Sequence, residues 1–137
     1  MGRVFFDTRK NVIDITVATT ILASDSGSLF TIDQASGAYA IALPAVADAQ
    51  RGWNCRFILK TAATNAVTIT ATAGDGDNII ARGLDMEDGA VGTETQGVDV
   101  ITFISGALAG DEVSLITDGV SWYATSIASD AAHITYS

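Results

Sequence analysis

The feature that most constrains this chain is a series of short segments in which apolar and polar residues alternate. In the segment 11–17, Ile13 and Ile15 occupy one face and Asp14 the other, and segments 53–60 and 67–72 repeat this pattern. A period of two residues places successive side chains on opposite faces of a β-strand. Each of these segments is therefore predicted to be a strand with one buried face.

The composition favours strands over helices throughout the chain. Val, Ile and Thr together number 40 of 137 residues, whereas Leu, Met, Glu, Gln, Lys and Arg together number 22. Branching at Cβ restricts side-chain rotation in a helix and packs well on a pleated sheet. Strands this short bury enough surface only when two sheets pack face to face. We expect an all-β fold, a jelly-roll-like β-sandwich of about nine or ten short antiparallel strands.

Turn-forming residues divide the chain into three regions. We expect an N-terminal arm and first strand over residues 1–18, a β-sandwich domain over 19–128 and a C-terminal tail over 129–137. Asp118-Gly119 between two alternating runs predicts a hairpin. The Gly-rich and acidic segment 83–97 is expected to be a long irregular loop, which in a compact domain usually binds something or moves. The tail is expected to be ordered only against a neighbour.

Charge is distributed unevenly and excludes several partners. Sixteen acidic residues against seven basic ones give a net charge of −9, and an acidic surface repels the phosphate backbone of nucleic acids. No apolar run approaches the roughly 20 residues that a membrane helix needs, so no membrane partner is expected. No signal peptide is visible, so synthesis in a cytoplasm is expected. The basic residues Arg3, Arg9 and Lys10 either serve solubility or attract an acidic partner.

The sequence contains few residues that could perform catalysis. The single histidine, His133, lies near the C-terminus, and there is no G-x-S-x-G nucleophile motif. His133 is expected at the surface or in an interface. Cys55 alternates with large apolar residues and is expected in the core. Trp53, Trp122 and Tyr123 are compatible with either core packing or a sugar-binding platform. We expect that the protein is not an enzyme and has no cofactor.

Only one group of residues in the sequence is a candidate for metal binding. One His and one Cys are too few for a tetrahedral zinc site. Asp75, Asp77 and Asn78 offer several oxygen ligands of the kind that calcium prefers, but their spacing is not that of an EF-hand. They are equally compatible with a simple turn between strands, so no metal site is assigned. Asp85, Glu87 and Asp88 are expected in a solvated loop.

The order of several segments resembles a known protein family. These segments are DSGSLFTID at 25–33, YAIALP at 39–44, GW at 52–53, TITA at 68–71, DVITF at 99–103, GDEVSL at 110–115 and DGVSWY at 118–123. Together they resemble the small capsid decoration (cement) proteins of tailed bacteriophages, over about residues 19–127. Similar segments also occur in phage tail and fibre modules.

The resemblance implies a compact β-sandwich that assembles as a homotrimer on the outer surface of the phage head. There it would clamp subunits of the major capsid protein after the head expands. The family has no catalytic residues to carry over. Arg3, Arg9 and Lys10 are the candidate capsid-contact residues. One alternative is a tail or fibre module that binds host surface glycans, and another is a cellular lectin-like sandwich that depends on calcium.

Overall fold

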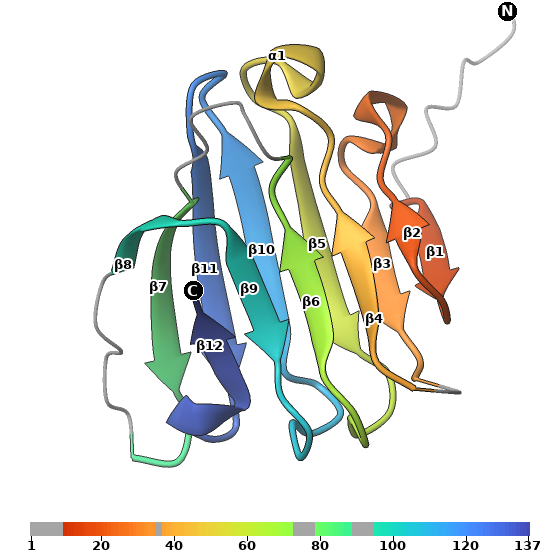
Figure 1. The fold of residues 1–137 in the computed structure, drawn as a ribbon, viewed down its shortest axis with the longest axis vertical. Helices are drawn as coiled ribbons and strands as arrows, with labels where there is room; N and C mark the ends of the chain where they lie inside the picture. Colours follow the sequence, from red (N-terminus) through yellow and green to blue (C-terminus); the bar gives the residue numbers. More distant parts are fainter. Residues whose placement is uncertain (1–9, 35–36, 73–78, 89–94) are drawn as a thin grey trace, which may run out of the picture.

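The computed structural model describes residues 10–34, 37–72, 79–88 and 95–137, which form two β-sheets packed face to face (Figure 1). In spatial order, the seven-stranded sheet contains β1 (Val12–Ile15), β3 (Leu29–Ile32), β5 (Asn54–Leu59), β10 (Glu112–Thr117), β11 (Trp122–Ala128), β7 (Ile79–Asp85) and β8 (Thr95–Val98). The five-stranded sheet contains β12 (Ile134–Tyr136), β9 (Val100–Phe103), β6 (Val67–Thr70), β4 (Tyr39–Ala42) and β2 (Thr19–Thr20). The predicted all-β sandwich is confirmed.

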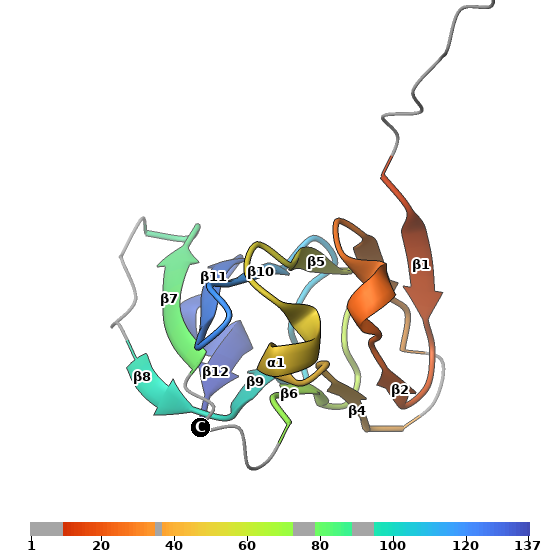
Figure 2. The ribbon, with the colours of Figure 1, turned by 90° about the horizontal axis from the view of Figure 1, so that it is seen from above.

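Three short helices accompany the strands within the described residues. They are the 3-10 helices η1 (Ala23–Asp25) and η2 (Ala131–His133) and the α-helix α1 (Val46–Ala49). Viewed from above, α1 lies over the open end between the two sheets (Figure 2). Val46 and Ala49 are buried there, so this single turn closes one end of the core. In the part of the chain that the structure describes, no helix has the length and apolarity to span a membrane.

The prediction that the strands pair antiparallel is wrong for half of the pairings. Five of the ten strand pairs are parallel: β1–β3, β3–β5, β2–β4, β4–β6 and β7–β11. From β1 to β6 the chain alternates between the two sheets, so successive strands of one sheet run in the same direction. A parallel pair needs a crossover connection, and for the four parallel pairs between β1 and β6 each crossover passes through a strand of the opposite sheet.

The predicted hairpin at Asp118-Gly119 is confirmed. It joins β10 to β11, which pair antiparallel up to Thr117 and Trp122. Gly119 has a positive φ of 91°, but Asp118 does not, so the loop is not the two-residue turn in which both central residues require positive φ. Instead, the Asp118 carboxylate accepts bonds from the backbone N–H groups of Ser121 and Val120, both at 2.8 Å. These two bonds lower the pKa of Asp118.

The segment 83–97 is more regular than expected. β7 continues through Gly83 as far as Asp85, and β8 begins at Thr95. The segment has no clear hydrophobic alternation, but parallel pairing with β11 satisfies its backbone along its first part. Residues 89–94 lie outside the described residues.

The segment 129–137, expected as a tail, belongs to the sandwich. It forms η2 and then β12, which pairs antiparallel with β9. Beyond this strand, the Ser137 backbone exchanges hydrogen bonds of 2.9 and 3.0 Å with Val100. The C-terminal segment is therefore an edge strand of the five-stranded sheet within one chain, and its order does not require a neighbouring molecule.

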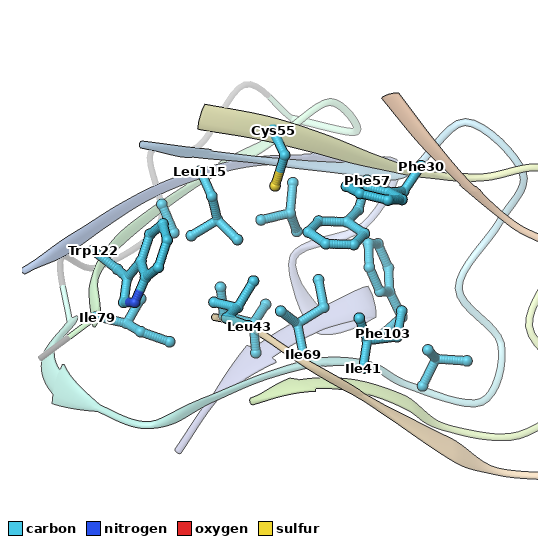
Figure 3. Packing of buried hydrophobic residues seen from close by; sticks show 14 of the residues in the cluster. Phe30, Ile41, Leu43, Cys55, Phe57, Ile69, Ile79, Phe103, Leu115 and Trp122 are labelled. Atoms are coloured by element: carbon cyan, nitrogen blue, oxygen red, sulfur yellow. The ribbon is translucent and has the colours of Figure 1, made fainter. Parts of the chain in front are cut away.

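The core lies between the two sheets, where the inward-facing residues of each meet (Figure 3). The rings of Phe30 and Phe57 stack with centroids 5.0 Å apart. Phe103 points toward them from the opposite sheet (Figure 3). Trp53 and Trp122 meet edge to face at 5.3 Å. These aromatic pairs bury large apolar areas, which is the main stabilising contribution in a sandwich of short strands.

Candidate functional site

His133 lies in a hydrogen-bonded cluster with Asp111 and Ser129, which we call the Asp111 cluster. The His133 Nδ1 atom is 3.0 Å from Asp111 Oδ2 and 2.9 Å from Ser129 Oγ. Ser129 also donates from its hydroxyl and its backbone N–H to Asp111 Oδ1, at 2.8 and 2.7 Å. The His133 side chain is only 17% exposed. His133 is thus partly buried within one chain, and the interface position expected from the sequence stays a prediction.

The Asp111 cluster contains the residue types of a serine-hydrolase triad but not its geometry. In a triad, the aspartate binds Nδ1 of the histidine while the serine faces Nε2, so the ring can transfer the serine proton. Here Ser129 and Asp111 both lie against Nδ1, and the Ser129 hydroxyl donates directly to Asp111. This arrangement does not activate the serine as a nucleophile. Its role is to fasten the C-terminal segment to the start of β10.

The aromatic residues do not form the platform that a sugar-binding site would need. Trp122 is fully buried and Trp53 is 3% exposed, so the core interpretation is confirmed for both. Tyr123 alone is exposed, and its hydroxyl donates to Asp118 Oδ2 at 3.0 Å. Cys55 is also in the core as expected, where burial raises the pKa of its thiol.

The outer side of the seven-stranded sheet carries a patch of apolar side chains. Cross-strand pairing places Ile116, Tyr123 and Ile80 in one row and Ile58, Ile127 and Leu84 in another. The two rows lie on β5, β10, β11 and β7, and a polar row of Arg56, Ser114, Thr125 and Arg82 runs between them. We call these six residues the outer apolar face. Ile116, Tyr123 and Leu84 are 49, 41 and 37% exposed. An ion pair between Arg56 and Glu112 lies among them, so those two charges neutralise each other.

Of the three candidate capsid-contact residues, only Lys10 is among the described residues. Its side chain is exposed, and it borders a hollow on the outer apolar face together with Asn54, Arg56, Ile116 and Tyr123. Arg3 and Arg9 lie outside the described residues. Lys10, at the end of the basic arm, is thus adjacent to the outer apolar face. The sequence pattern did not reveal this position, because Lys10 is far along the chain from β5, β10 and β11.

Of the residues considered for metal binding or for a solvated loop, the structure describes only those expected in the loop. Asp75, Asp77 and Asn78 lie outside the described residues. Glu87 and Asp88 are exposed, but Asp85 is only 8% exposed on the inner side of β7, so the expectation of a solvated loop is wrong for Asp85. Within residues 10–34, 37–72, 79–88 and 95–137, no group of three or more His, Cys, Asp or Glu side chains could hold a metal ion.

Comparison with known proteins adds no family assignment. No protein-family model and no curated protein sequence matches this chain. The relation to phage decoration proteins therefore remains a prediction that depends on the segments quoted above.

Proposed function

We propose that this protein is a structural virion protein, a decoration (cement) protein on the outer surface of a tailed-phage capsid. It binds the major capsid protein as a homotrimer and stabilises contacts between capsid subunits without catalysis. The observation that supports this most is the outer apolar face on a chain with a net charge of −9. Exposed apolar side chains that form a continuous row across neighbouring strands, as Ile116, Tyr123 and Ile80 do, indicate a protein-binding surface.

The size of this face fits a contact role. The four strands that carry it, spaced about 4.8 Å apart with roughly six residues each at about 3.3 Å per residue, present a sheet face of roughly 20 by 20 Å that includes the polar row. That is about half of the ~800 Å² that one partner contributes to a standard interface. Lys10, which borders this face, supplies further contact area. Each bound copy then stabilises the assembled shell by mass action, by about 2.7 kcal/mol at a concentration 100 times Kd.

Sedimentation with emptied phage heads tests this proposal. We expect the protein to have the solution mass of three chains and to sediment with expanded heads that lack their decoration protein. Ile116→Glu places a charge on the outer apolar face and should abolish sedimentation with heads. Thr68→Glu places the same charge on the outward side of β6 in the other sheet and should retain it. Recovery only with detached tails would overturn the capsid proposal in favour of a tail or fibre module.

The basic arm provides a second prediction. Replacing Arg3, Arg9 and Lys10 together with alanine should weaken attachment to heads, and more strongly at low salt. Electrostatic attraction extends over a Debye length of about 30 Å at 0.01 M salt but only about 8 Å at 0.15 M. Replacing Arg3 and Arg9 with lysine preserves the charge and should preserve attachment. Equal attachment of the alanine variant at every ionic strength would contradict a role for the arm.

The glycan-binding alternatives predict different results. A tail or fibre module would bind host surface glycans on an array, and a lectin-like sandwich would lose affinity when calcium is chelated. Burial of Trp53 and Trp122 removes two of the three aromatic residues considered for such a site. The capsid proposal therefore expects no glycan binding and no effect of a chelator on attachment.

A further inference from the structure

A cavity of about 390 Å³ lies between the sheets, bordered by β7, β8, β11 and the C-terminal segment. Figure 1 shows β12 next to the β7–β11 pair at this end of the sandwich. The cavity exists because the inward residues of β7 and β11 are small here: Gly83 pairs with Ser126 and Asp85 with Ala128. A Cβ atom at Gly83 would lie 3.1 Å from Ser126 Oγ and 3.3 Å from Tyr136 OH. Glycine at this position therefore keeps the cavity open.

One wall of the cavity carries a carboxylate that is more than nine-tenths buried. Asp85 alternates along β7 with buried Ile79 and Ala81, so its side chain faces the inside of the sandwich. Asp85 Oδ1 accepts a bond of 2.8 Å from the backbone N–H of Glu87. Among the residues that the structure describes, no cationic side chain pairs with Asp85. Buried charges in proteins are normally paired, so this carboxylate favours a cationic ligand.

Hydroxyl groups lie next to the carboxylate in the same cavity. Ser126 Oγ and Tyr136 OH share a hydrogen bond, and burial raises the pKa of Tyr136, which keeps this hydroxyl neutral. Two hydroxyls that share one bond retain free lone pairs, which accept N–H bonds. Residues two apart on one face of a strand are about 6.6 Å apart. Asp85 and the hydroxyl pair opposite Gly83 thus line the same side of the cavity, one strand repeat apart.

We propose that this cavity binds a primary ammonium group carried on a short alkyl chain. The ammonium pairs with Asp85 and donates a further bond to the Ser126–Tyr136 hydroxyl pair. The alkyl chain packs against Ala128, Ala131 and Ile134, which supply the apolar part of the lining. An anion would be repelled by Asp85, and a neutral ligand would leave the carboxylate without a counter-charge in a site of low dielectric constant. The inference is independent of the capsid proposal.

Two kinds of molecule carry a primary ammonium group on a short alkyl chain. One is a free alkylamine, and the other is another protein that supplies a lysine side chain. NMR titration of the ¹⁵N-labelled full chain at pH 7 compares them, with n-butylammonium for the first and Nα-acetyl-lysine methylamide for the second. We expect saturable shifts at the amide signals of Gly83, Asp85, Ser126 and Tyr136. The neutral isostere n-butanol should bind at least tenfold more weakly. Tighter binding of the lysine derivative identifies a protein partner, and tighter binding of butylammonium identifies a free amine.

Two variants locate the binding site. Asp85→Asn should weaken ammonium binding at least tenfold, whereas Glu87→Gln removes the same charge from an exposed neighbour and should leave binding unchanged. Gly83→Ala crowds the Ser126 and Tyr136 hydroxyls, because its Cβ atom would lie 3.1 and 3.3 Å from them, and should also weaken binding. The butylammonium and butanol comparison uses the unchanged protein, so it remains decisive if a variant fails to fold. Equal binding of butylammonium and butanol, or no shift with either ammonium compound, would overturn the proposal.

Discussion

Replacing Phe57 with alanine is expected to lower the free energy of unfolding by about 3–5 kcal/mol. Phe57 is fully buried on the inner side of β5 and stacks on Phe30, with ring centroids 5.0 Å apart. Both sheets contribute to its surroundings (Figure 3), so the structure should collapse only in part into the space that the ring leaves. The loss therefore combines the lost free energy of moving the ring out of water with the cost of the cavity that remains.

Urea denaturation followed by tryptophan fluorescence measures this effect, since Trp53 and Trp122 lie in the same core. The midpoint should fall while the slope of the transition stays the same. Tyr123→Ala is the control, because Tyr123 lies on the outer side of β11 in the same sheet and is exposed. Its midpoint should remain close to that of the unchanged protein. A loss below about 1.5 kcal/mol for Phe57→Ala would contradict a rigid, tightly packed core.

Replacing Asp111 with alanine is expected to lower the free energy of unfolding by about 2–4 kcal/mol, because each buried donor left without a partner costs about 1–3 kcal/mol. The Asp111 side chain is 3% exposed and joins three parts of the chain. Besides its bonds to Ser129 and His133, it accepts from the backbone N–H of Leu108 at 2.9 Å. The substitution removes all of these interactions at once.

The change at Asp111 should also loosen the C-terminal segment selectively. Amide hydrogen exchange of β12 should accelerate more than that of β5, because the Asp111 cluster holds Ser129 and His133 in place ahead of β12. Asp130→Ala provides the control, since Asp130 caps η2 through a single 2.8 Å bond to the Ala132 N–H. A lost cap of this kind costs about 1 kcal/mol. Equal effects of the two substitutions would show that Asp111 is not the centre of the cluster.

The character of each strand could be predicted from the sequence because it depends on local spacing. The alternation around Cys55 and Phe57 predicted a strand and the face that it buries, and β5 has both. Asp118-Gly119 predicted the β10–β11 hairpin for the same reason, since a tight connection forces neighbouring runs to pair. The pattern failed at Asp85, where a charged residue occupies a core-facing position beside a cavity rather than a solvated loop.

The partners of each strand were decided by the tertiary structure. Val12 pairs with Leu29, and Leu29 with Arg56, at unequal separations that leave no repeat visible in the sequence. The Asp111 cluster joins residues up to 22 positions apart. Side-chain spacing determines which face of a strand is apolar, and this is a local property. Which faces then meet depends on how all the strands share one core, so the parallel pairings, the cavity and the Asp111 cluster arise only from the packed fold.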